Sequence, residues 1–289
     1  MIKKSIIILF FAGLTWPLKA QQEFTLYHMP ALAQSSFLNP AAVPYHKVSF
    51  AIGTNVYYGF SNSSLSVSSI LQEDGTISLN DFVNNLDPND NFVGLPVKFE
   101  FMHARFKVRN NFFSISSQIV ADTRFTFPRD MIGIFVNGLP DGASFSGLGI
   151  DHVSYLENAI GFTRSDPKSP FTYGARIKYL SGLFNLNTSS SRFEVGINND
   201  SIYNYSIETQ LNMRATNFDD VELESTQDVL EFLSANSGFA FDGAFGAQLT
   251  NRLSLNFVLN NVGFINWDEN VNEYSTDATL NYSGFDVEL

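Results

Sequence analysis

Apolar and polar residues alternate with a period of two along most of this chain. In residues 48–60 every second position except Thr54 is apolar, and the positions between them are mostly small or polar. This period places the two sets on opposite faces of an extended strand. The same pattern recurs in residues 113–127, 171–179, 203–213, 239–249 and 253–259. It predicts an all-β protein with about ten strands, the last near residues 276–282.

The length and composition of these strands favour a membrane protein. Strands of about ten residues suit a tilted membrane strand and exceed the usual strand of soluble sheets. Their polar faces carry ionisable residues of both signs, as the wet interior of an outer-membrane barrel does. We therefore predict an antiparallel transmembrane β-barrel with short loop helices, and a soluble sandwich is the alternative. The candidate lumen-facing residues are Asp122, Arg124, Arg176, Lys178, Glu208 and Asp242.

Three segments between the strands predict short helices. Residues 78–86 begin with a Ser78/Asp81 pair, and residues 225–236 begin with a Ser225/Asp228 pair, both typical of helix N-termini. In residues 128–138 a proline stands at the start and Gly138 after the end. The longest connections, residues 61–95 and 215–238, are expected to face outward.

The N-terminus predicts export. Residues 1–20 combine Lys3 and Lys4, an apolar run and Ala20 before Gln21, as a cleaved signal peptide does. The run is shorter than a membrane-spanning helix, which disfavours the alternative of a single-span anchor. With no cysteine, the exported protein has no disulfides, and its net charge of −12 makes nucleic acid an unlikely partner. We expect the outer membrane of a Gram-negative bacterium.

The last residues bear on whether the predicted barrel is complete. The ending GFDVEL lacks the terminal amphipathic strand with a final aromatic residue that such barrels usually carry. An unclosed sheet edge in lipid would leave backbone groups unpaired. Either the barrel is incomplete in this chain or the strand count is inaccurate.

No motif in the chain supports catalysis. The four histidines are far apart, and nucleophile, phosphate-binding and zinc-protease motifs are missing. We expect no enzymatic activity, no cofactor and no metal site, and residues 87–91, DPNDN, should form a plain turn. Arg176 and Lys178 share one strand face, where they either favour an anionic solute or pair with Asp122, Glu208 or Asp242 across the lumen.

Three stretches of the sequence carry a family resemblance. They are FTLYHMPALAQSSFLNPAAVP after the leader, FSGLGIDHVSYLENAIGFTR at residues 145–164, and YGARIKYLSGLFNLNT at residues 173–188. These stretches resemble a Bacteroidota family of outer-membrane β-barrels that is catalogued as a domain of unknown function. The resemblance covers nearly the whole chain and implies longer members, but it implies no substrate.

A shorter match involves Asn39-Pro40-Ala41. It is similar to the Asn-Pro-Ala segment of FadL-like transporters, which include the type IX secretion protein PorV, and of PorP/SprF-like proteins. In the FadL group this segment is a hatch inside the lumen. The resemblance implies a hatch formed by Phe37, Leu38, Asn39, Pro40 and Ala41 within residues 21–47, ahead of a barrel at residues 48–289. The alternative is an extended periplasmic lead-in to the first strand.

Two functions remain open from the sequence. The first is passage of a small or hydrophobic ligand through a partly plugged barrel in outer-membrane lipid. The second is a structural barrel that holds periplasmic or surface protein partners, associated with type IX secretion, gliding or the cell surface.

Overall fold

The computed structural model of the chain describes residues 24–27, 29, 32–63, 76–138, 142–198, 204–218, 225–250 and 253–282. The predicted signal peptide and the ending GFDVEL lie outside the described residues. In the described part of the chain, no helix is both long and apolar enough to cross a membrane.

The protein is mostly antiparallel β-sheet, so the all-β prediction is confirmed. Eleven strands form one sheet. The strands are β1 (Val48–Tyr58), β2 (Ser61–Asn62), β3 (Asn91–Val108), β4 (Asn111–Phe127), β5 (Gly142–Ser146), β6 (Gly149–Ser165), β7 (Phe171–Asn198), β8 (Asn204–Thr216), β9 (Ser237–Thr250), β10 (Leu253–Ile265) and β11 (Val271–Tyr282).

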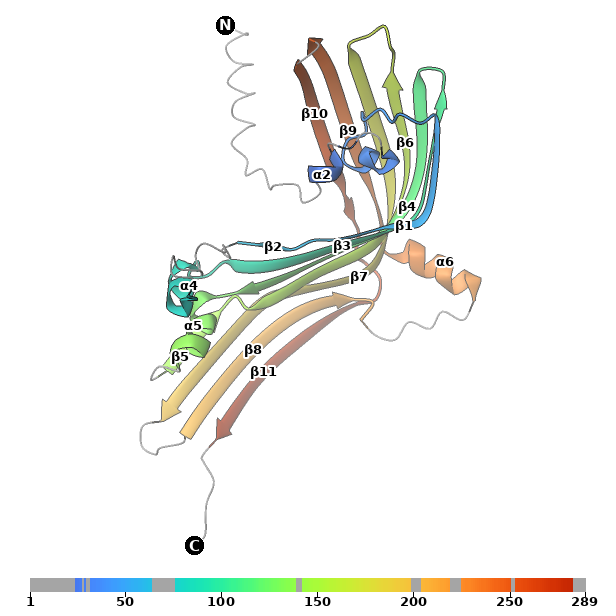
Figure 1. Cartoon of the computed structure of the whole chain (residues 1–289). Coiled ribbons are helices and arrows are strands. Elements are labelled where there is room, and N and C mark those ends of the chain that lie inside the picture. The colour runs from blue at the N-terminus through green and yellow to red at the C-terminus, as the bar shows by residue number, and fades with distance from the viewer. Residues whose placement is uncertain are drawn as a thin grey trace, which may run out of the picture.

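The sheet has two arms that meet at a bend (Figure 1). The strand order β1-β3-β4-β6-β7 forks at β7, because residues 171–181 pair with β9 and residues 185–198 pair with β8. We call the part with β1, β9 and β10 the upper arm; it includes residues 97–108, 111–121, 155–165 and 171–181. The lower arm contains β2, β5, β8 and β11, with residues 91–96, 122–127, 149–154 and 185–198.

Buried polar contacts join the two branches of the fork. The fully buried Asn236 accepts hydrogen bonds through Oδ1 from the backbone N–H groups of Asp268 (3.0 Å) and Glu269 (3.1 Å). Its own carbonyl accepts a bond of 2.5 Å from the N–H of Gly182 on β7. A Cβ at Gly182 would lie 2.6 Å from the Trp267 ring, so this close approach requires glycine.

In the described residues the sheet is open and forms no closed barrel, which agrees with the alternative of an incomplete barrel. Its last strands do not return to β1, because the fork sends β10 along the upper arm and β11 along the lower arm. Register shifts at 52/55, 100/102 and 154/155 lie close to the bend. Each extra residue of such a bulge bends its strand and increases the local twist.

The predicted helices are present. They are α4 (Leu79–Asn85), α5 (Arg129–Asn137) and α6 (Thr226–Ala235). Ser78 caps α4, and Ser225 forms a reciprocal capping box with Asp228 at α6. The expected connection at residues 61–95 is shorter than predicted, because β2 and the start of β3 pair within it.

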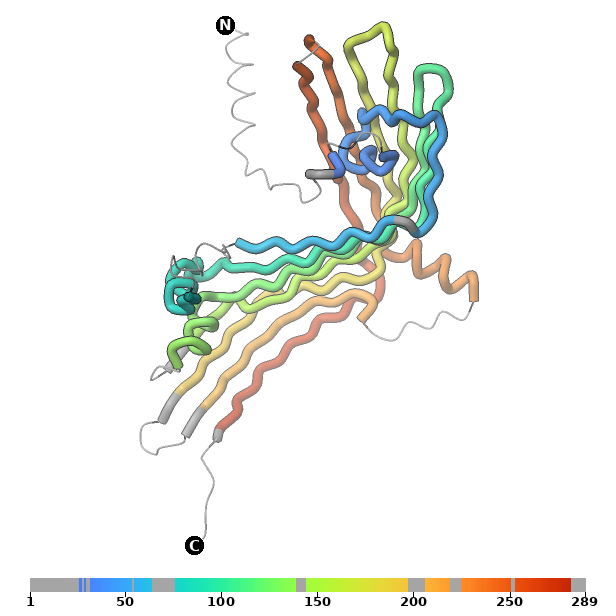
Figure 2. The backbone as a smooth tube through the Cα atoms, viewed as in Figure 1, coloured from blue at the N-terminus to red at the C-terminus, as the bar shows by residue number. Residues whose placement is uncertain are grey.

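The two faces of the upper arm differ in polarity. Its outer face presents exposed large apolar side chains, for example Phe50 (63%), Ile177 (57%) and Phe257 (65%). Its inner face holds the charged residues that are buried in the described part of the chain, which are Glu100, Arg105, Glu157, Arg176, Lys178 and Asp242. The inner face also carries the N-terminal segment, residues 32–44, which includes the short helix η1 (Ala33–Phe37) (Figure 2).

Candidate functional site

The N-terminal segment is held on the inner face through its backbone carbonyl groups. Asn260 of β10 donates its amide to the Leu38 carbonyl at 2.7 Å. Thr163 of β6 donates its hydroxyl to the Pro40 carbonyl at 2.5 Å, and Arg105 of β3 donates to the Ala42 carbonyl at 2.6 Å. Alternate carbonyls of the segment are thus recognised by side chains from three strands.

Small residues permit this close contact. The wall residue Gly174 of β7 lies against Pro40, and a Cβ at this glycine would overlap the Pro40 carbonyl. On the segment, Ala41 and Ala42 are buried, and the side chain of Asn39 accepts a bond from the N–H of Ala41 at 3.0 Å. This local turn directs the chain along the wall.

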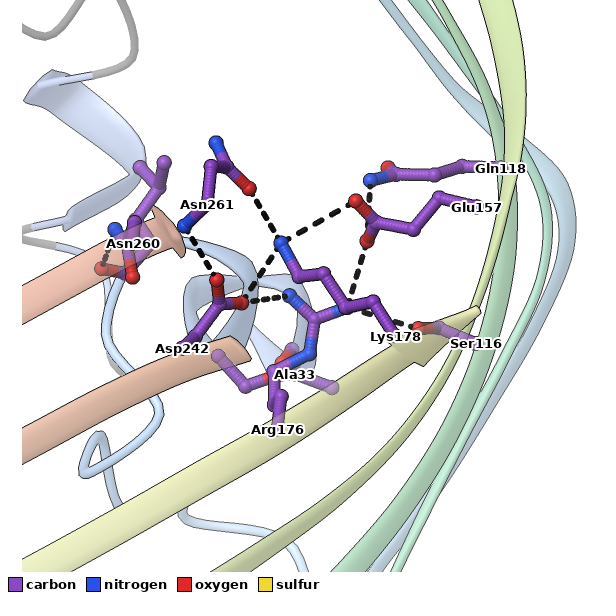
Figure 3. Close-up of polar contacts among 11 residues, drawn as sticks. Ala33, Ser116, Gln118, Glu157, Arg176, Lys178, Asp242, Asn260 and Asn261 are labelled. Atoms are coloured by element: carbon purple, nitrogen blue, oxygen red, sulfur yellow. Dashed lines mark hydrogen bonds and ion pairs between the residues drawn. The ribbon is translucent and has the colours of Figure 1, made fainter. Parts of the chain in front are cut away.

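An ion cluster of two cations and two carboxylates lies beside this segment (Figure 3). Arg176 contacts Glu157 and Asp242, at 3.1 Å each. Lys178 contacts Glu157 at 3.2 Å and Asp242 at 2.8 Å. The four side chains are 0 to 3% exposed. Removing one member of this buried set would leave a charge buried without its partner, which is strongly destabilising. The four side chains therefore stay together as a unit.

Neighbouring polar groups complete the cluster. Gln118 donates to Glu157 at 3.0 Å, and Arg176 donates to the Ser116 hydroxyl at 3.0 Å. From β10, the side-chain oxygen of Asn261 accepts a bond from Lys178 at 2.5 Å, and its N–H donates to Asp242 at 2.7 Å. The cluster therefore links β4, β6, β7, β9 and β10 across the inner face.

Phe37 couples the N-terminal segment to the ion cluster. The Arg176 guanidinium lies 4.9 Å from the centre of the Phe37 ring, a cation–π distance. The edge of the same ring meets His103 with centroids 5.2 Å apart. A single aromatic side chain thus bridges the segment, the cluster and β3.

A cavity of about 670 Å³ lies between the N-terminal segment and the wall. Leu26 of the short helix α2 (Phe24–Tyr27) and Phe37 and Leu38 of the N-terminal segment line it on the side opposite the wall. The wall side contributes Asn55, Tyr57, Pro96, Lys98, Glu100, Gln118, Val120, Ala121, Asp122, Val153, Tyr155, Glu157, Arg176, Lys178, Asn260 and Asn261. Its volume lies within the range of small-molecule sites.

A second hollow of about 900 Å³ continues along the inner face of the lower arm. Asp122 and Val153 line both spaces, so the two adjoin at the bend. The second hollow also contains Arg124, which lies 4.0 Å from the Phe92 ring centre and 3.4 Å from Asp90. The Arg124 and Asp90 side chains are 34% and 77% exposed, so this pair is solvated.

The six candidate lumen residues divide into three groups. Arg176, Lys178 and Asp242 lie together in the ion cluster. Asp122 and Arg124 line the adjoining hollow. Glu208 lies exposed on β8, opposite Glu194, far along the lower arm. Of the expected partners for the two cations, only Asp242 makes ion pairs with them among the described residues.

Sequence reasoning missed Glu157, the second carboxylate of the cluster. Glu157 stands next to Asn158 in a strand where apolar and polar residues alternate only weakly. The sequence therefore did not show on which face of the strand Glu157 lies. The strand register identifies it, because Glu157 lies opposite Gln118 on β4. The inward residues Glu100, His103 and Arg105 of β3 were also missed, since the bulge at 100/102 interrupts the alternation.

Residues 87–91 form a turn, as predicted. The Asp87 carboxylate accepts backbone hydrogen bonds from Asn89 (2.9 Å) and Asp90 (3.0 Å). These two donors lower the pKa of the Asp87 carboxyl. Among the described residues, no group of three or more His, Asp or Glu side chains is arranged to hold a metal ion.

The arrangement is suited to binding and to sealing. The charged groups of the ion cluster are paired with one another, and the contacts to backbone carbonyls position a peptide segment. The family model of a family of unknown function, DUF5723, matches residues 40–289. No curated protein and no solved structure matches the chain.

Proposed function

The chain belongs to the DUF5723 family, and we propose that it is a non-enzymatic outer-membrane protein whose N-terminal segment plugs a route for a small or hydrophobic ligand. One observation carries the proposal. The outer face of the upper arm is a continuous exposed apolar surface, while its inner face buries charged residues. Water-soluble proteins rarely expose so large an apolar area, whereas a transmembrane β-barrel has apolar residues outside and polar residues inside.

The turns support an orientation for this wall. At the free end of the upper arm, β3 and β4 are joined by a tight turn at Arg109 and Asn110, and β9 and β10 by residues 251–252. Two connections at the lower arm are longer and contain α4 and α5. Outer-membrane barrels have short periplasmic turns and longer extracellular loops. We therefore assign the upper arm to the membrane and the lower arm to the cell surface.

The site supports a plugged route. The second hollow leads to the cavity at the bend, and the N-terminal segment covers that cavity. Several polar atoms under the segment make no hydrogen bond with the described residues, among them Ser35 Oγ and both ring nitrogens of His103. Each such buried group costs about 1–3 kcal/mol, which limits how tightly the segment is held. A plug of this kind is suited to displacement.

Deleting residues 23–44 tests the plug. The mature protein and the deletion variant would be purified from the outer-membrane fraction, checked for heat-modifiable mobility on a gel, and placed in liposomes. We expect solute-driven swelling to increase with the deletion. Unchanged leakage from a folded deletion variant would contradict the plugged route.

A second candidate function is a partner-binding barrel of the type IX secretion, gliding or cell-surface kind. The observation that favours it is β11, a strand of twelve residues at an edge of the lower arm with polar side chains along one face. An unpaired edge strand can accept a strand from another protein. Co-purification of a surface or periplasmic protein with a barrel that does not leak would support this function over passage.

A further inference from the structure

The cavity under the N-terminal segment has unsatisfied hydrogen-bond acceptors. Glu100 is 2% exposed and lines the cavity, and neither of its carboxylate oxygens makes a well-formed hydrogen bond with the described residues. The side chains of Gln34 and Asn55 interact with this carboxylate, but neither reaches the geometry of a well-formed hydrogen bond. The side-chain oxygen of Asn260, in the same lining, is also without a hydrogen-bond partner among the described residues.

The cationic side chains of the cavity already interact with other side chains of the protein. Arg176 and Lys178 are both neutralised by Glu157 and Asp242. Lys98 lies over the ring of Tyr57, 5.6 Å from its centre. The groups with remaining capacity are therefore acceptors, and the Asp122 carboxylate adds a further negative charge to the lining. A ligand that supplies N–H donors and a positive charge would complement them.

Aromatic side chains also line the cavity. Phe37 and Tyr57 already lie against Arg176 and Lys98, so Tyr155 on the wall side is the ring that remains for a ligand cation. Aromatic faces attract organic cations more strongly when the site excludes water. The volume of about 670 Å³ accommodates a ligand with an apolar body as well as a charged group.

We propose that this cavity is a binding site for a small organic cation, an ammonium or guanidinium carried on an apolar body, with Glu100 as its main acceptor. This deepens the proposed function, since it rests on the plugged route and names the class of ligand that the route takes. Phe37 and Leu38 of the N-terminal segment, together with Leu26 of α2, cover the site.

Calorimetric titration of the purified mature chain in detergent micelles tests the site. Phenethylammonium is the probe, and 2-phenylethanol is its neutral counterpart of the same shape. We expect saturable binding of the cation and binding of the alcohol that is weaker by about tenfold or more, because the alcohol lacks the charge that pairs with the carboxylate. Absence of saturable cation binding, or equal binding of the two probes, would overturn the proposal.

Two substitutions of the same chemistry refine the result. Glu100→Gln removes the charge and keeps the volume, and we expect it to weaken cation binding by about tenfold. Glu208→Gln makes the same change outside the cavity on β8 and should leave binding unchanged. Equal affinity of Glu100→Gln and the wild type would contradict the role of Glu100. The comparison of the two probes on the wild type stands even if a variant does not fold, and binding in micelles is independent of the membrane location and of liposome leakage.

Discussion

The two arms of the sheet are built from partly the same strands but present different surfaces. In the upper arm, Phe50, Ile177 and Phe257 are exposed on the outer face while the ion cluster is buried on the inner face. In the lower arm, β8 and β11 carry exposed polar residues such as Glu208 and Asp277, and the Arg124–Asp90 pair is solvated. One continuous β7 thus belongs to both arms. The arms therefore differ in the side chains that they expose and bury, although they share this strand.

The largest expected difference concerns charged pairs. Asp242→Asn leaves Arg176 and Lys178 without one of their two carboxylates, and we expect a loss of about 3–5 kcal/mol in the free energy of unfolding because the remaining charges stay buried. Glu194→Gln breaks the exposed pair with Arg192 in the lower arm and should cost less than about 1 kcal/mol. Urea unfolding in lipid vesicles measures both. Similar losses for the two variants would contradict the contrast between the arms.

The next largest difference is expected when a charged side chain is introduced into each arm. Phe257→Arg should destabilise the protein in lipid vesicles by about 2–4 kcal/mol, the cost of an arginine near the centre of the bilayer. Thr279→Arg, on the exposed β11 strand, should have a small effect within about 0.5 kcal/mol. The same unfolding measurement applies. If Phe257→Arg is neutral or stabilising, the outer face of the upper arm faces water.

Two glycines of β7 provide a matched test of the plug. Gly174→Ala places a methyl group against the Pro40 carbonyl, whereas Gly196→Ala in the lower arm meets nothing closer than 3.9 Å. We expect Gly174→Ala to raise the rate of proteolysis within residues 32–44 by about tenfold, equal to about 1.4 kcal/mol of weakened docking. Gly196→Ala should leave the rate unchanged. Equal rates in both variants would mean that the segment does not depend on this contact.

The smallest expected difference concerns two of the cation–π pairs, one in each arm. Phe37→Leu removes the ring from a buried arginine and should cost about 2 kcal/mol, while Phe92→Leu removes it from the partly exposed Arg124 and should cost about 0.5–1 kcal/mol. Leucine keeps an apolar side chain at both positions. Thermal and urea unfolding can rank the two variants, and a larger loss for Phe92→Leu would reverse the predicted order.

Local patterns in the sequence predicted the elements of this fold but not their long-range arrangement. Alternation located the strands, and the Ser78 and Ser225 caps located two helices, because these signals depend on neighbours in the chain. The bend and the fork depend on bulges and on the contacts of Asn236, which no period reveals. The pairing of Lys178 with Glu157 likewise depends on the register between β6 and β7. Asp242 could be named as a partner because its strand alternates clearly.

The central claim is that the outer face of the upper arm contacts lipid and that the lower arm lies in water. The chain has no cysteine, so Phe257→Cys on β10 and Thr279→Cys on β11 each introduce a unique site for a spin label. Electron paramagnetic resonance of the labelled proteins in lipid vesicles would compare collisions with oxygen, which concentrates in lipid, and with a water-soluble nickel complex. We predict that the label at residue 257 favours oxygen and that the label at residue 279 favours nickel. Preference for nickel at both positions would contradict the account.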